Sequence, residues 1–206
     1  MECLNGTSKL KREKIGQFVV PFMILMASYV VQDAIIFPLE VIIRPDDNVN
    51  LVSLIFIPHG VKVAMVLIFG LSVLPSVFLA QLINGMIMQN ILNLDVQIVL
   101  GALGGTVCFL FPLLLYNKHY RQPFFSSPIF QKTGIKNSLS LFLSFAFAAS
   151  VLNSIFHATI HGFSFGLLAV MYLFGDIAGA VAIFILFILI FRPYVLRMAT
   201  RGADHE

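Results

Sequence analysis

The chain has 206 residues, of which 59% are hydrophobic and 11% are charged, and its net charge at neutral pH is +3. Because a soluble domain carries roughly 25% charged residues, this composition excludes an ordinary soluble fold and favours a protein that crosses a membrane several times. It also excludes a nucleic-acid-binding protein, because the positive residues gather at the ends of apolar segments and form no basic stripe with interleaved aromatic residues.

Six apolar segments approach the ~20 residues that a helix needs to cross a bilayer. In chain order they are residues 16–41, 51–70, 74–91, 97–116, 138–158 and 164–191. Helices are expected because lipid offers no hydrogen-bond partners to the backbone groups of an open strand. We therefore predict an all-α transmembrane bundle of about six spans, formed by residues 15–193 between a basic tail, 1–14, and a short tail, 194–206.

Lysine and arginine residues mark one side of this bundle. Eleven of the 13 lie in residues 9–14, 118–136 and 192–201, whereas Arg44 and Lys62 lie elsewhere. Six crossings place both termini and the long 117–137 loop on one side, and the positive-inside rule makes that side cytoplasmic. We expect a multi-pass protein of the plasma (inner) membrane with both termini in the cytoplasm.

Two glycine motifs indicate where helices approach closely. Gly101 and Gly105, with Gly104 between them, form a G-x-x-x-G in the fourth segment, and Gly175 and Gly179 form another in the sixth. Small residues let helix backbones come together in lipid, where the hydrophobic effect does not drive association. The alternative is that glycine is simply common in membrane helices.

Charged residues inside spans require a reason, because each costs at least ~2.5–3.5 kcal/mol at the bilayer centre. Lys62 and Asp176 both fall near the middle of their segments. We predict that they pair directly, or through a water molecule or an amide, with Asp33 as a competing partner. Such a pair can serve a ligand or ion site, or can serve only to fix the register of the helices.

Further polar residues fall at similar depths, between the bilayer midplane and the outer surface, while the inner half is almost wholly apolar. This pattern predicts a polar cavity that opens outward, since a through-pore would need polar lining along its full length. The candidate ligand-binding residues are Asp176, Lys62, Asp33, His59, Gln81, Asn84, Asn153 and His157.

A metal site is the weaker alternative. His157 and His161 are four residues apart, as two ligands on one helix face can be, and His59 could supply a third. The sequence has no His-Glu-x-x-His motif, and its two cysteines, Cys3 and Cys108, form no paired motif. No nucleophile–base pair or phosphate-binding glycine loop stands out. We therefore assign no metal, no cofactor and no enzymatic activity.

Three motifs together resemble a known family. They are FIPHGVKVAMVLIFG at 56–70, LPSVFLAQLIN at 74–84 and FGDIAG at 174–179, followed by an apolar run that ends at Arg192-Pro193. Their order over residues 50–193 resembles the first type of membrane-associated sensor domain, a bacterial integral membrane module that usually precedes cyclase, phosphodiesterase or histidine-kinase domains. The chain departs from this family in lacking tryptophan and any output domain.

The resemblance implies a sensor, with Pro58, Gly60, Gly175 and Asp176 as the corresponding positions. Without an output domain, we expect it to bind a small molecule and to signal through a protein partner or a second copy of itself. Two alternatives remain open. The chain could be the substrate-binding subunit of a transporter that a separate complex energises, or a structural or assembly subunit of a membrane complex.

Overall fold

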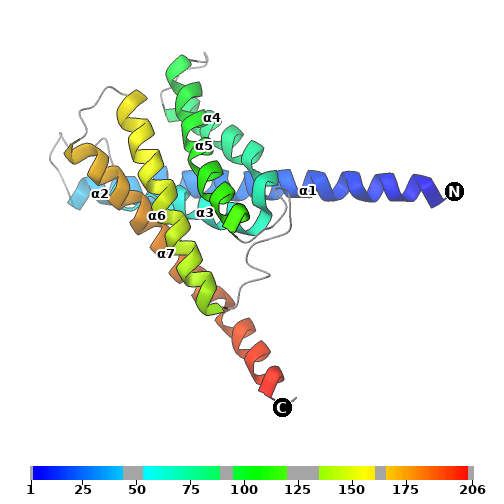
Figure 1. The fold of residues 1–206 in the computed structure, drawn as a ribbon. Coiled ribbons are helices and arrows are strands. Elements are labelled where there is room, and N and C mark those ends of the chain that lie inside the picture. Colours follow the sequence, from blue (N-terminus) through cyan, green and yellow to red (C-terminus); the bar gives the residue numbers. More distant parts are fainter. Residues whose placement is uncertain (1, 44–52, 89–94, 120–134, 161–165, 204–206) are drawn as a thin grey trace.

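The computed structural model describes residues 2–43, 53–88, 95–119, 135–160 and 166–203. Every regular element within these ranges is helical, so the all-α prediction is confirmed there (Figure 1). The elements are α1 (Glu2–Val31), the π-helical turn η1 (Gln32–Ile36), α2 (Phe37–Ile43), α3 (Ile57–Phe69), the 3-10 turn η3 (Gly70–Val73), α4 (Leu74–Met88), α5 (Val96–His119), α6 (Ile135–Ile160) and α7 (Leu167–Ala203).

Five helical stretches are long and apolar enough to cross a membrane, which indicates a multi-pass membrane protein. They are Ile15–Ile43, Ile57–Met88, Val96–Tyr116, Ser140–Ile160 and Ala169–Ile190. The second stretch contains both segments that the sequence predicted as separate spans. Its helices α3 and α4 have 13 and 15 residues, each fewer than the ~20 that a full crossing requires. The count of six spans therefore stays a prediction.

The chain reverses direction between α3 and α4. Gly70 ends α3 with a φ of 68°, in the left-handed region that glycine adopts at no steric cost. The turn η3 follows and occupies the gap between the predicted segments 51–70 and 74–91. Beyond the turn, Lys62 Nζ lies 3.2 Å from Gln81 Oε1, so the two helices fold back on each other.

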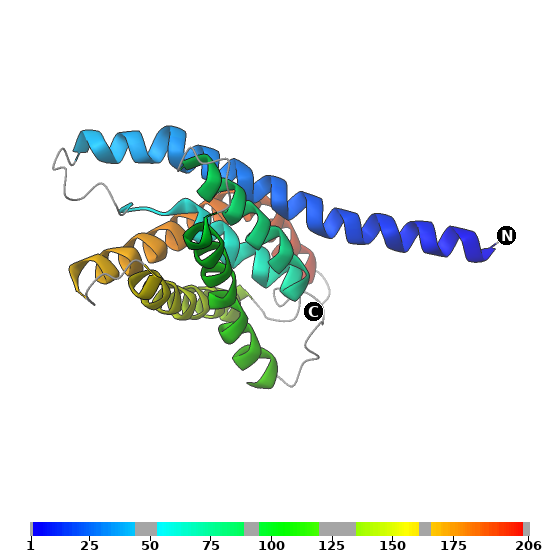
Figure 2. The same ribbon diagram turned by 90° about the horizontal axis from the view of Figure 1, so that it is seen from above.

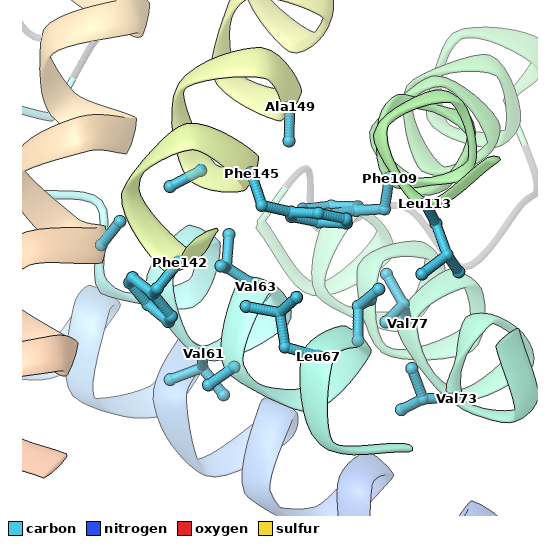
Figure 3. Close-up of a cluster of buried hydrophobic side chains, with 14 of the residues drawn as sticks. Val61, Val63, Leu67, Val73, Val77, Phe109, Leu113, Phe142, Phe145 and Ala149 are labelled. Carbon is cyan, nitrogen blue, oxygen red and sulfur yellow. The ribbon is translucent and has the colours of Figure 1, made fainter. Parts of the chain in front are cut away.

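Helix α3 lies at the centre of the bundle, in contact with α1, α6 and α7 (Figure 2). Its residues 58–64 are all buried. Toward η3 it packs into an apolar core of aliphatic and aromatic side chains from four helices (Figure 3). We call this set the apolar core: Val63, Leu67, Val73, Val77, Phe109, Leu113, Phe142 and Phe145.

Both terminal helices are longer than predicted. Helix α1 begins at Glu2, within the expected basic tail, and α7 continues past Ile190 to Ala203. Both ends project from the bundle (Figure 1). For α1 the physical reason is local, because the tail is rich in lysine, arginine and glutamate, which tolerate a helix well. The breaks between the first and second and between the fifth and sixth predicted segments, at 44–48 and 161–162, lie outside the described residues.

The α7 glycine motif marks a close approach. A Cβ atom at Gly175 or Gly179 would collide with the backbone carbonyl of Ser53 or Phe56, respectively. The α5 motif is confirmed in part: a Cβ atom at Gly105 would meet the Gln81 side chain and one at Gly104 the ring of Phe156, whereas Gly101 faces open space. The close approach thus lies one turn further along α5 than the first glycine of the motif.

Candidate functional site

A cavity of about 330 Å³ lies at the end of the bundle opposite η3. Its walls come from η1, α2, the segment before α3, and the adjoining ends of α4, α6 and α7. We call it the polar cavity; its lining residues are Gln32, Asp33, Phe37, Ser53, Phe56, Asn84, Met88, Asn153, His157, Tyr172 and Asp176. Five of the eight predicted ligand-binding residues are in this set. The other three, His59, Lys62 and Gln81, lie beyond the cavity wall.

Asp176 forms the floor of the polar cavity and is 1% exposed. Asn153 Nδ2 donates a hydrogen bond of 2.8 Å to its Oδ2 atom. His59 Nδ1 lies 3.2 Å from the same oxygen, an electrostatic contact rather than an aligned hydrogen bond. The other ring nitrogen of His59 lies 3.1 Å from the hydroxyl of Ser150. Helices α3, α6 and α7 are thus joined through one carboxylate.

The direct form of the predicted Lys62–Asp176 pair is not found, and contact through a water molecule or an amide stays a prediction. Asp176 contacts His59 instead, while the Lys62 ammonium donates to Gln81. His59 precedes Lys62 by three residues on α3, so it lies one turn nearer to the helix start, where Asp176 packs. Lys62 and Asp176 remain close enough to interact electrostatically without direct contact.

The surroundings of Lys62 explain how a charge is held in this position. The side chain is 2% exposed. Its ammonium lies 5.5 Å from the ring centre of Phe56 and 5.7 Å from that of Phe109, both within cation–π range. Gln81 accepts a hydrogen bond from Lys62, and its amide N–H donates to the Thr106 hydroxyl on α5. The polar network therefore extends from α7 to α5.

An extended segment, residues 53–56, forms one wall of the cavity where the sequence predicted a helix from residue 51. Phe56 N–H donates to the Gly175 carbonyl at 2.9 Å, which holds this segment along α7. The helix begins at Ile57 because Pro58 suits a first helical turn and lacks the N–H needed in a helix interior. The two α7 glycines provide the space for it.

Side chains from the end of α1 hold this wall from the other side. Gln32 Oε1 accepts from the Ile57 N–H at 2.9 Å, and its Nε2 donates to Ser53 Oγ at 2.9 Å. Ser53 in turn donates to Glu40 at 2.8 Å. Gln32 opens the π-helical turn η1, and such turns recur at functional sites because they re-aim side chains.

The metal alternative finds no support in the described part of the chain, where no three His, Cys, Asp or Glu residues form a metal-binding group. His157 instead stacks on the ring of Tyr172, with centres 5.2 Å apart. His59 contacts Asp176 and Ser150. His161 lies outside the described residues, so its part of the prediction remains untested.

Six lining residues were not among the sequence candidates. Phe37, Phe56 and Met88 are apolar, and nothing in an apolar segment distinguishes a cavity-facing side chain from a lipid-facing one. The other three, Gln32, Ser53 and Tyr172, are polar residues inside predicted spans and could have been identified from the sequence. Gln32 is a polar residue inside a predicted span and directly precedes Asp33.

Comparisons of the chain with protein-family models, with curated proteins and with solved structures found no match. The resemblance to membrane-associated sensor domains therefore stays a prediction. Its motif residues do meet in space: a Cβ atom at Gly60 would lie 2.5 Å from the carbonyl oxygen of Gly179. The short motifs thus coincide with the contact between α3 and α7 beside the floor of the polar cavity.

Proposed function

We propose that this chain is a plasma (inner) membrane protein that binds a small ligand in the polar cavity and passes the resulting change to a protein partner. The observation that carries the proposal is the buried carboxylate of Asp176 at the floor of a cavity between membrane-spanning helices. A cavity of about 330 Å³ is within the range of small-molecule sites.

A ligand site accounts for the arrangement better than a purely structural role. Buried polar groups that only join helices pack against one another and leave no space. Here Asp33, Asn84 and His157 border open volume, beside a floor that is almost fully buried. Keeping so many polar groups at membrane depth is costly, and a ligand with matching polar groups offsets that cost.

The two ends of the bundle support an outward-facing site. The polar cavity is at the end that carries α2, and the apolar core fills the end that carries η3. The described helix ends that carry basic residues, at positions 9–14, 118, 136 and 192–201, fall toward the η3 end, which the positive-inside rule assigns to the cytoplasm. A ligand would therefore enter from the non-cytoplasmic side and meet an apolar seal.

Helix α7 supports a signalling role. It carries Asp176 at the cavity floor, packs through Gly175 and Gly179 against the extended segment, and continues without interruption to Ala203. A ligand that alters the contact between this segment and α7 would act on a helix that reaches beyond the apolar stretch at the opposite end. A partner bound there would sense the change, and two states of α7 would suffice.

Ligand capture tests the proposal. The purified chain, in a detergent with an uncharged headgroup, is incubated with a polar metabolite extract, and the retained molecules are identified by mass spectrometry. We expect a specific molecule with the wild type and none with Asn84→Leu, which replaces a polar lining group by an apolar one without touching the Asp176 contacts. Thr159→Leu, on the exposed face of α6, is the matched control and should retain it. If the wild-type protein retains no molecule, the proposal fails and the polar residues of the cavity have only a structural role.

A further inference from the structure

We infer that the ligand of the polar cavity is a small organic cation with a single positive charge, held by Asp33 and Asp176 among aromatic rings. This inference rests on the proposed function and adds the chemical class of the ligand. It comes from the charges, rings and hydrogen-bond donors around the cavity.

The charges of the cavity do not balance. Two carboxylates, Asp33 and Asp176, line it, and no lysine or arginine is among the described lining residues. Lys62, beyond the floor, is the one cation near enough to act on Asp176 within the described residues. Within the described residues, two carboxylates thus lie near one ammonium, and a ligand with one positive charge would supply a second cation.

Asp33 is the cavity carboxylate without a cation partner among the described residues. It lies in η1, half-buried, at the wall of the cavity. Within residues 2–43, 53–88 and the other described ranges, no hydrogen-bond donor or cation contacts its side chain. Glu40, one helix segment later, is by contrast satisfied by Ser53 and the Ile55 N–H. The carboxylate of Asp33 is therefore the available anchor for a cation.

Three aromatic rings border the same space: Phe37, Phe56 and Tyr172. Aromatic faces attract ammonium and guanidinium groups, and more strongly where water is excluded. The protein already uses this contact, because the Lys62 ammonium lies 5.5 Å from the ring centre of Phe56. The aromatic lining favours a cation over an anion, which the negative ring faces would repel.

The hydrogen bonds of the cavity wall also favour a cation as the ligand. Gln32 donates to Ser53, Ser53 donates to Glu40, and Asn153 donates to Asp176. These three donors are engaged within the protein, and the Asp33 carboxylate at the cavity wall can only accept hydrogen bonds when ionised. An ammonium or a guanidinium brings the donors that this carboxylate needs, and the Asn84 amide can accept from it as well.

The test uses choline and methylguanidinium as probes, with isothermal titration calorimetry on the full chain in a maltoside detergent. The neutral isostere of choline, 3,3-dimethylbutan-1-ol, and the anion 3,3-dimethylbutanoate serve as matched controls for shape. We expect at least one cation to bind and both controls to fail. Binding of the alcohol or the carboxylate in preference to the cations would overturn the cation assignment and leave the proposed function standing. Absence of binding by all four probes, together with failure of the metabolite capture, would overturn both.

Asp33→Asn gives the decisive variant because it removes the charge and keeps the shape. We expect about a tenfold or larger loss of cation affinity, the size of a charged contact. Asp95→Asn, an exposed carboxylate before α5, removes the same charge outside the cavity and should bind as the wild type does. Equal losses of cation affinity in both variants would show that only the overall charge of the protein matters, which would contradict Asp33 as the anchor of the cation.

A lipid headgroup carries the same ammonium chemistry as a free cation. Titrating choline into the chain in phosphatidylglycerol nanodiscs, with or without phosphatidylcholine, separates the two sources. A weaker apparent affinity in the presence of phosphatidylcholine identifies the headgroup as an occupant. An unchanged affinity identifies a soluble cation.

Discussion

The two ends of this bundle are built from the same helices and serve opposite purposes. At the η3 end, α3 to α6 contribute an apolar core of valine, leucine and phenylalanine. At the α2 end, the same helices contribute His59, Gln81 and Asn153 to a connected polar network. The division falls within single helices, since α3 carries Lys62 on one turn and Leu67 on the next.

This contrast shows how a membrane protein can keep charged groups at depth. Asp176, His59 and Lys62 each contact a polar side chain on another helix, which fixes the helices relative to one another. The apolar core needs no such partners and excludes water by packing alone. The polar end is thus suited to recognition, and the apolar end to sealing the membrane.

The largest effect is expected from Lys62→Met, which removes the buried ammonium that donates to Gln81 and acts electrostatically on Asp176, so that the Asp176 charge loses its compensation. Breaking a buried pair in this way costs about 3–5 kcal/mol. The change should appear as a lower midpoint of thermal unfolding in maltoside. Combining Lys62→Met with Asp176→Asn should recover more than half of the loss. A single variant as stable as the wild type would mean that water already screens both groups.

Leu67→Ala opens a void in the apolar core, and we expect a loss of stability of about 2–5 kcal/mol. Because the void is remote from the polar cavity, choline affinity should stay within experimental error of the wild type. Leu103→Ala, on the exposed face of α5, provides the control for the same side chain facing lipid. A loss of choline affinity equal to that of Asp33→Asn would contradict the separation of the two ends.

The contact between α7 and the extended segment is tested by a single methyl group. Gly179→Ala would push against the Phe56 backbone, and we expect about 1–3 kcal/mol of destabilisation from overpacking. Gly101→Ala has open space and should stabilise its helix by up to about 1 kcal/mol. Equal effects at both positions, measured by thermal unfolding, would remove the basis for a close approach at α7.

The sequence predicts much of this organisation because polar residues are conspicuous in apolar segments. Asp33, Asn84, Asn153, His157 and Asp176 were all identified in this way and all line one cavity. Their depth along each segment, together with the basic clusters, also indicates which end of the bundle is polar.

Other features could not be predicted from the sequence, because they depend on contacts between segments. The unwound stretch before Ile57 exists because Gly175 accepts its backbone hydrogen bond. The choice of His59 over Lys62 as the contact of Asp176 depends on a single helical turn. Phe37 and Phe56 resemble any lipid-facing phenylalanine until their neighbours are known.

The most direct test of the central claim measures water access at the two ends. In a background of Cys3→Ser and Cys108→Ala, the variants Asn84→Cys and Val77→Cys are exposed to a membrane-impermeant methanethiosulfonate reagent added to the non-cytoplasmic face of intact cells. Asn84 lines the polar cavity, and Val77 is 0% exposed in the apolar core. We predict rapid labelling of Asn84→Cys, slowed by choline, and no labelling of Val77→Cys. Protection of Asn84→Cys, or equal labelling of the two, would contradict a wet outer cavity above a dry inner seal.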